Sequence, residues 1–165
     1  MNNKRWRIYM YNVLFIDQEN SVRSILAEAL LNHWGKDKFN AYSSGSEPSG
    51  EVHPQVIETL KHAKLPTENL YSKSVNEFSK EDSPQMDFVF ILCDKVRGEV
   101  CPIWPDHTIT SVWAIDSPYS DDLNIDAIRE ILHSLENRIN LFVQLPISKL
   151  EHLKLKEEIH NLSHH

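Results

Sequence analysis

The segment MDFVFILC, residues 86–93, constrains the fold more than any other part of this sequence. Apart from Asp87 it is apolar throughout, whereas a strand with one face in water would alternate apolar and polar residues. A strand buried on both faces is typical of a parallel sheet that is covered by helices. The segment therefore predicts an α/β protein with a parallel sheet.

The rest of the chain alternates between the two kinds of element. Three further segments have the length and apolar character of strands: residues 12–16, 39–43 and 106–115. Helical periodicity marks residues 21–34, 53–64 and 120–145, and a short helix is expected near Val75–Phe78. Asp121 or Asp122 is the expected cap of the long helix. This alternation predicts βαβ units, with ligands bound at the carboxyl ends of the strands.

Composition narrows the function classes. The chain has 165 residues, and its formal net charge of -7 argues against a nucleic-acid binder, which needs a basic face. No apolar run reaches the length of a membrane span. Two cysteines make no disulfide framework, so we expect a cytoplasmic protein. We expect one domain over residues 1–146 and a charged helical extension over 147–165, which is more consistent with a solvated helix than with a protein-docking element.

The loop after the first predicted strand is the first candidate site. Backbone N–H groups at a helix start attract an oxyanion, and the guanidinium of Arg23 could hold two of its oxygens. However, the loop begins with Asp17 and also carries Glu19, so two negative charges lie where an anion would bind. Spacing alone leaves a second interpretation open, a plain capped helix with an exposed arginine.

Four segments, in this order, resemble the low-molecular-weight protein tyrosine phosphatases and the thioredoxin-coupled arsenate reductases. They are DQENSVRS with ILAEALLNHW, then YSSGSEPSGEVHPQVIETLK, LCDKVRGEVCPIWP and VWAIDSPYS. The first is similar to the phosphate-binding loop, which reads Cys, five residues, Arg and Ser. The third is similar to the stretch with two resolving cysteines, and the fourth to the general-acid segment. The resemblance covers about residues 12–145 and implies a three-layer αβα fold with a four-stranded parallel sheet.

The resemblance also implies a mechanism. In the family a loop thiolate attacks phosphorus or arsenic, an arginine holds the oxyanion, and an aspartate before proline protonates the leaving oxygen. Arg23 matches that arginine. The anion-binding loop would comprise Asp17, Gln18, Glu19, Asn20, Ser21, Val22, Arg23 and Ser24.

This chain departs from the family pattern at three places. Asp17 stands at the nucleophile position, Glu19 replaces a loop glycine, and Ser117 stands at the general-acid position. We therefore expect a catalytically inactive relative that acts as a binding or regulatory module. Asp17 is expected to stand in for the missing phosphate by pairing with Arg23 and the helix N-terminus, with a solvent-exposed Asp17 as the alternative.

Two other functions stay open. The first is an active arsenate reductase or tyrosine phosphatase with a non-standard nucleophile such as Cys93, with thioredoxin as its reductant. The second is a sensor that binds an oxyanion or a phosphoprotein without turnover, which the charges of Asp17 and Glu19 disfavour. A protein partner is compatible with either non-catalytic function.

Cys93 and Cys101 match the resolving-cysteine positions. Since no adduct can form without the loop cysteine, two reduced, half-buried thiols are expected, although oxidation to each other is an alternative. The resemblance further implies a potassium ion bound by Asn20, Glu28 and Ser43, and no other cofactor is expected. Residues 13–30 also resemble the start of a response-regulator receiver domain, but the strand at 39–43 lacks the phospho-accepting aspartate such a domain needs.

Overall fold

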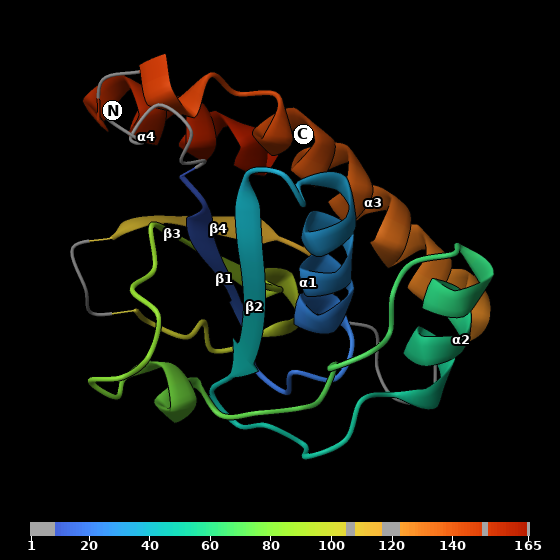
Figure 1. Cartoon of the computed structure of the whole chain (residues 1–165). Coiled ribbons are helices and arrows are strands. Elements are labelled where there is room, and N and C mark those ends of the chain that lie inside the picture. Colours follow the sequence, from blue (N-terminus) through green and yellow to red (C-terminus); the bar gives the residue numbers. More distant parts are fainter. Residues whose placement is uncertain (1–8, 105–107, 117–122, 150–151, 165) are drawn as a thin grey trace.

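The protein, seen here as a computed structural model, forms a four-stranded sheet in which all neighbouring strands are parallel (Figure 1). The structure describes residues 9–104, 108–116, 123–149 and 152–164. The strands are β1 Tyr11–Asp17, β2 Phe39–Gly45, β3 Phe88–Cys93 and β4 Ile109–Ala114, in the order β2-β1-β3-β4. The predicted fold class is therefore confirmed, and all six residues of β3 are buried, as the sequence of that segment requires.

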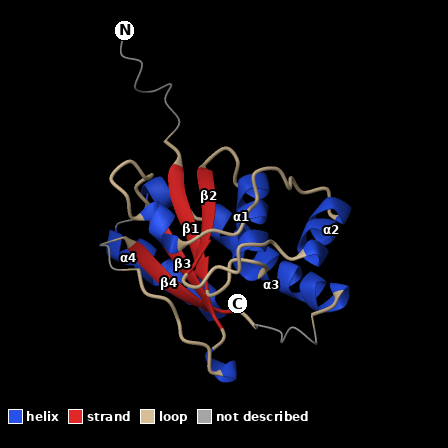
Figure 2. Ribbon diagram, turned by 90° about the horizontal axis from the view of Figure 1, so that it is seen from below, coloured by secondary structure: helices blue, strands red, loops and turns tan. Residues whose placement is uncertain are grey.

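In the described part of the chain, four α-helices accompany the sheet: α1 Arg23–Trp34, α2 Pro54–His62, α3 Ile125–Val143 and α4 His152–Asn161. Both views show α1, α2 and α3 on the same side of the sheet (Figures 1 and 2). Their buried side chains pack with Val13 and Phe15 of β1 and with Phe90 of β3. This face holds most of the apolar core.

The opposite face has a thinner cover. Leu14 and Ile16 of β1 point to this side, because successive strand residues alternate between the faces. They pack with residues of the short 3₁₀ helix Val75–Phe78 and with Cys101 and Trp104, from the chain that follows β3. The third layer of the fold is thus one helical turn and extended chain, and the segment after β3 is part of it.

Two expectations about the C-terminal third are wrong. Asn124 caps α3, because its side chain accepts a hydrogen bond of 2.9 Å from the N–H of Ala127; Asp121 and Asp122 lie outside the described residues. The C-terminal segment is helical as expected, but it is not a solvated helix. Ile159 and Leu162 are 1% and 6% exposed and join the core beside β4, so their apolar side chains anchor the segment.

No helix among the described residues is long and apolar enough to cross a membrane.

The end of β2 lies close to the loop that follows β1. The last residue of β2, Gly45, pairs with Asp17, and a Cβ at Gly45 would lie 2.7 Å from the carbonyl oxygen of Gln18 and 3.0 Å from the nitrogen of Asn20. Both contacts are to backbone, which cannot rotate away. The glycine is therefore needed for the loop to approach the sheet.

We predict that Gly45→Ala destabilises the protein by about 1–3 kcal/mol, the usual range for overpacking. The neighbouring exposed Ser46→Ala is the matched control and should change the free energy of unfolding little. Urea denaturation of both variants checks this. Equal stability of the two variants would contradict the close approach.

Candidate functional site

The candidate site lies where β1 and β3 end, and its first component is the carboxylate of Asp17. Oδ1 accepts a hydrogen bond of 2.7 Å from the N–H of Asn20, and Oδ2 accepts one of 2.9 Å from the N–H of Ser24. Asp17 is 2% exposed, so the solvent-exposed alternative is wrong. The carboxylate fills the loop and satisfies N–H groups at the start of α1, where Val22 provides no side-chain cap.

The loop around Asp17 is held by its own side chains and carbonyl groups. Asn20 has a left-handed backbone conformation, with φ of 49°, and its Nδ2 donates to Ser24 Oγ at 2.7 Å and to Ser43 Oγ at 3.0 Å. The carbonyl groups of Gln18 and Ser21 accept hydrogen bonds from neighbouring loops. The side chain of Glu19 is exposed, so the expectation that its charge enters the loop is wrong.

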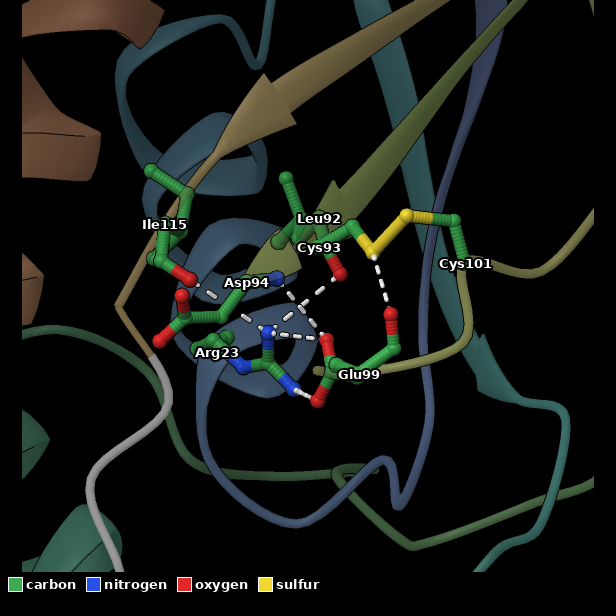
Figure 3. The surroundings of a disulfide bond; sticks show 7 residues. All are labelled: Arg23, Leu92, Cys93, Asp94, Glu99, Cys101 and Ile115. Atoms are coloured by element: carbon green, nitrogen blue, oxygen red, sulfur yellow. Dashed lines mark hydrogen bonds and ion pairs between the residues drawn. A yellow bond between two sulfur atoms is a disulfide. The ribbon is translucent and has the colours of Figure 1, made fainter. Parts of the chain in front are cut away.

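The second component is an ion pair between Arg23 and Glu99 (Figure 3). Arg23 is 5% exposed, so the plain helix with an exposed arginine is excluded. Its Nη1 and Nη2 donate to Oε1 and Oε2 of Glu99 at 2.9 and 2.6 Å, and its Nε lies 3.9 Å from Asp17 Oδ2. Oε1 also accepts a hydrogen bond of 3.0 Å from the N–H of Asp94. A side-chain carboxylate thus takes the two-oxygen grip expected of an oxyanion.

Sequence reasoning missed Glu99. Its only signal is an acidic residue inside CDKVRGEVC, the segment between the two cysteines that follows a buried strand. Glu99 lies 76 residues from Arg23 in sequence, and only the fold brings the two together.

The third component is a disulfide between Cys93 and Cys101, with a Cα–Cα distance of 5.5 Å. The expectation of two reduced thiols is therefore wrong. Cys93 is the last residue of β3, and its sulfur lies 3.8 Å from the carbonyl oxygen of Glu99 (Figure 3). The disulfide ties the segment that carries Glu99 to the end of the sheet. A redox role for the pair stays a prediction.

Burial and the charged partners shift the pKa values of this cluster in opposite directions. Loss of hydration raises the pKa of Asp17, and the positive charge of Arg23 and the two N–H donors oppose that rise only in part. For Arg23, burial lowers the pKa, but the hydrogen bonds that its guanidinium donates to Glu99 and the negative charges of Asp17 and Glu99 outweigh this effect, so the net shift of the pKa is upward. The guanidinium therefore stays charged and organises the carboxylates around it.

A second buried cluster lies behind the loop. Ser43 donates a hydrogen bond to Glu28 Oε1, and Asn20 bonds to the same serine. The ammonium of Lys73 lies 3.4 Å from Glu28 Oε1, 3.3 Å from Ser43 Oγ and 3.0 Å from the carbonyl oxygen of Tyr71. The three residues matched to a potassium site thus lie together, and the ammonium group of Lys73 lies among them. The potassium ion itself stays a prediction, and sequence reasoning missed Lys73.

The general-acid position and possible metal-ligand groups are the remaining features of the site. Ser117, at the general-acid position, lies outside the described residues, and Asp116 before it is exposed. Within the described part of the chain, no three His, Cys, Asp or Glu side chains are grouped so as to hold a metal ion.

Comparison with known proteins agrees with this architecture. The model of the family "Low molecular weight phosphotyrosine protein phosphatase" matches residues 12–158. The chain belongs to this family. It is 30% identical to arsenate reductase 1 of Bacillus cereus over 129 residues, which are 76% of this chain and 85% of that protein.

Two further relatives point the same way. Arsenate reductase 2 of Staphylococcus haemolyticus is 34% identical over 110 residues, which cover 64% of this chain and 77% of that protein. The crystal structure of an arsenate reductase from Archaeoglobus fulgidus superposes with a TM-score of 0.66 at 26% identity, covering 81% of this chain and 99% of that one. The architecture is therefore shared along 99% of the Archaeoglobus fulgidus chain.

We predict that Lys73→Met costs about 3–5 kcal/mol of stability, because it leaves the buried carboxylate of Glu28 without its counter-charge. Lys61→Met, at an exposed position of α2, is the matched control and should cost little. The double variant Lys73→Met/Glu28→Gln should recover part of the loss. Urea denaturation measures all four free energies of unfolding. If Lys73→Met behaves like Lys61→Met, the pair does not hold the cluster.

A second prediction concerns pH. Burial raises the pKa of Glu28 above its ordinary value of 4.5, and Lys73 opposes this rise only in part. The folded state therefore binds the proton of Glu28 more tightly than the unfolded chain does. The contribution of this protonation to the free energy of unfolding is complete below pH 4.5 and is lost as the pH rises through the folded pKa.

Replacing Glu28 with Gln removes this titration. The free energy of unfolding of the native chain minus that of Glu28→Gln should thus fall as the pH is raised above 4.5. Chemical denaturation at a series of pH values up to neutrality checks the sign. A difference that rises with pH would mean that Lys73 outweighs the burial of Glu28.

Proposed function

We propose that this chain is a catalytically inactive member of its family and acts as a binding or regulatory module. The observation that carries the proposal is the Asp17 carboxylate, which accepts hydrogen bonds from the N–H groups of Asn20 and Ser24. In the family these loop groups would face the oxyanion of the substrate. Here they are taken by a side chain that stands where the attacking thiolate would be.

Two further observations support the proposal. Arg23, matched to the arginine that holds the oxyanion, is paired through both terminal nitrogens with Glu99. A hydroxyl at Ser117 has a pKa far too high to replace a carboxylic acid as proton donor. Nucleophile, oxyanion grip and acid are thus all altered, and the buried negative charges also disfavour a sensor for dianionic phosphate. A protein partner is the proposed class of ligand.

Turnover of p-nitrophenyl phosphate, and of arsenate in the presence of thioredoxin, tests the proposal. The native chain should show no turnover, whereas Asp17→Cys/Glu99→Gln/Ser117→Asp should be active. This variant restores the thiol and the acid and removes the carboxylate that binds Arg23. The expected contrast is on the order of a million-fold, the usual cost of losing a catalytic nucleophile. Asp17→Ser/Glu99→Gln/Ser117→Asp is the matched control, since it lacks only the thiol. Turnover by the native chain at a rate near that of the Cys variant would refute the proposal.

The disulfide favours one second candidate, an arsenate reductase that works without the loop thiol. Cys93 as a thiolate would attack arsenic, and water would leave. Cys101 would then attack the sulfur of Cys93 and form the disulfide. The sulfur–arsenic bond would break with its electron pair going to arsenic, which would leave as arsenite. Arsenate-dependent formation of this disulfide in the reduced chain without oxygen, with one arsenite released for each disulfide, would establish this candidate.

A further inference from the structure

We propose that Arg23 and the N–H of Asp94 form a carboxylate-binding site that Glu99 fills, and that opens when the Cys93–Cys101 disulfide is reduced. The proposal deepens the proposed function, on which it rests, by naming the ligand class of the same site and the condition under which it binds. Its test measures access to Arg23 and not turnover, so the two can fail separately.

Glu99 shows what the site binds. Its two carboxylate oxygens accept from Nη1 at 2.9 Å and Nη2 at 2.6 Å, and Oε1 also accepts from the N–H of Asp94 at 3.0 Å. Two parallel bonds from a guanidinium to a planar carboxylate give both strength and geometric selectivity. The same three donors would therefore bind a carboxylate from another molecule once Glu99 has left.

The surroundings favour a carboxylate over a tetrahedral dianion. A phosphate would need donors for its remaining oxygens, but the N–H groups of Asn20 and Ser24 are bound to Asp17. Asp17 Oδ2 also lies 3.9 Å from Nε of Arg23, so a second charge on the ligand would be repelled. A planar anion with a single charge avoids both costs.

The disulfide holds Glu99 in place. Glu99 is two residues before Cys101, which is bonded to Cys93 at the end of β3. Val96 and Val100 in the same segment are 98% and 81% exposed, so their side chains pack little against the rest of the protein. Opening the loop between Cys93 and Cys101, which have a sequence separation of 8, lowers the effective concentration of Glu99 at Arg23 by roughly tens of fold in the chain-entropy model.

The opening step is a thiol–disulfide exchange with a dithiol reductant. Cys101 is half-buried and Cys93 is 1% exposed, so the first thiolate attacks the sulfur of Cys101 and Cys93 leaves as a thiolate that takes up a proton. The second thiolate of the reductant then attacks its partner sulfur in the mixed disulfide and releases the thiol of Cys101. Two electrons and two protons pass to the chain, and the reductant becomes a disulfide.

Arginine labelling with phenylglyoxal, measured by mass spectrometry, tests whether reduction of the disulfide exposes Arg23. The full chain is compared as the disulfide form, after reduction with dithiothreitol and desalting under nitrogen, and as Cys93→Ser/Cys101→Ser. Arg23 should be labelled roughly tens of fold faster in the latter two, following the loss of loop closure. Arg129 is an exposed internal reference, and the buried Arg138 reports unfolding. Slow labelling of Arg23 in all three forms, or faster labelling of Arg138 together with Arg23, would overturn a local gate.

Glu99→Gln tests the role of the carboxylate. It should raise the labelling of Arg23 even in the disulfide form, whereas Glu81→Gln at an exposed position should not. If Glu99→Gln leaves Arg23 as protected as in the native chain, Glu99 does not close the site.

The ligand class is tested by protection of the reduced chain. Acetate and a capped tripeptide that copies Gly98–Glu99–Val100 should slow the labelling of Arg23, and the tripeptide with glutamine should not. Stronger protection by the tripeptide than by acetate assigns the site to a carboxylate carried by a protein, and the reverse order assigns it to a small free carboxylate. Better protection by inorganic phosphate than by either, at equal ionic strength, would overturn the carboxylate assignment.

Discussion

The structure of this site depends on one constraint, the neutralisation of a buried guanidinium. Arg23 is 5% exposed at the start of α1, and an ion taken out of water at such depth is stable only with partners of opposite charge and satisfied donors. Glu99 takes both terminal nitrogens, and Asp17 lies beside Nε. The carbonyl oxygens of Leu92 and Ile115, each 3.4 Å from Nη1, complete its surroundings.

This constraint connects features that otherwise look separate. The resemblance to a phosphate-binding loop predicts that the arginine and the loop amides bind an oxyanion. Here the chain provides one carboxylate for the amides, Asp17, and another for the arginine, Glu99. The disulfide after β3 then matters because it fixes the segment that carries Glu99. The Glu28–Lys73 pair follows the same rule behind the loop, where Lys73 supplies a positive charge beside Glu28 and Ser43.

Family membership sets the architecture but not the activity. The relatives described above are named as arsenate reductases, and this chain shares the fold of the solved one. The chemistry depends on a few side chains at the ends of β1 and β3 and after β4. The proposed binding role therefore rests on the contacts of Asp17, Arg23 and Glu99 in this chain.

The sequence by itself determined the sheet, the helices and the position of the loop. Local pattern suffices there, because an apolar run such as residues 86–93 must be buried on both faces, and a strand followed by a loop and a helix places Asp17 and Arg23 at a carboxyl end. The contacts of Glu99 and Lys73, and the exposure of Glu19, were decided only by the tertiary structure. Their partners lie far away in sequence, and no local pattern shows which charge compensates a buried ion. The burial of Ile159 and Leu162 was missed for the same reason. The segment around them is rich in charged residues, and its apolar side chains are buried by packing beside β4 in the folded protein.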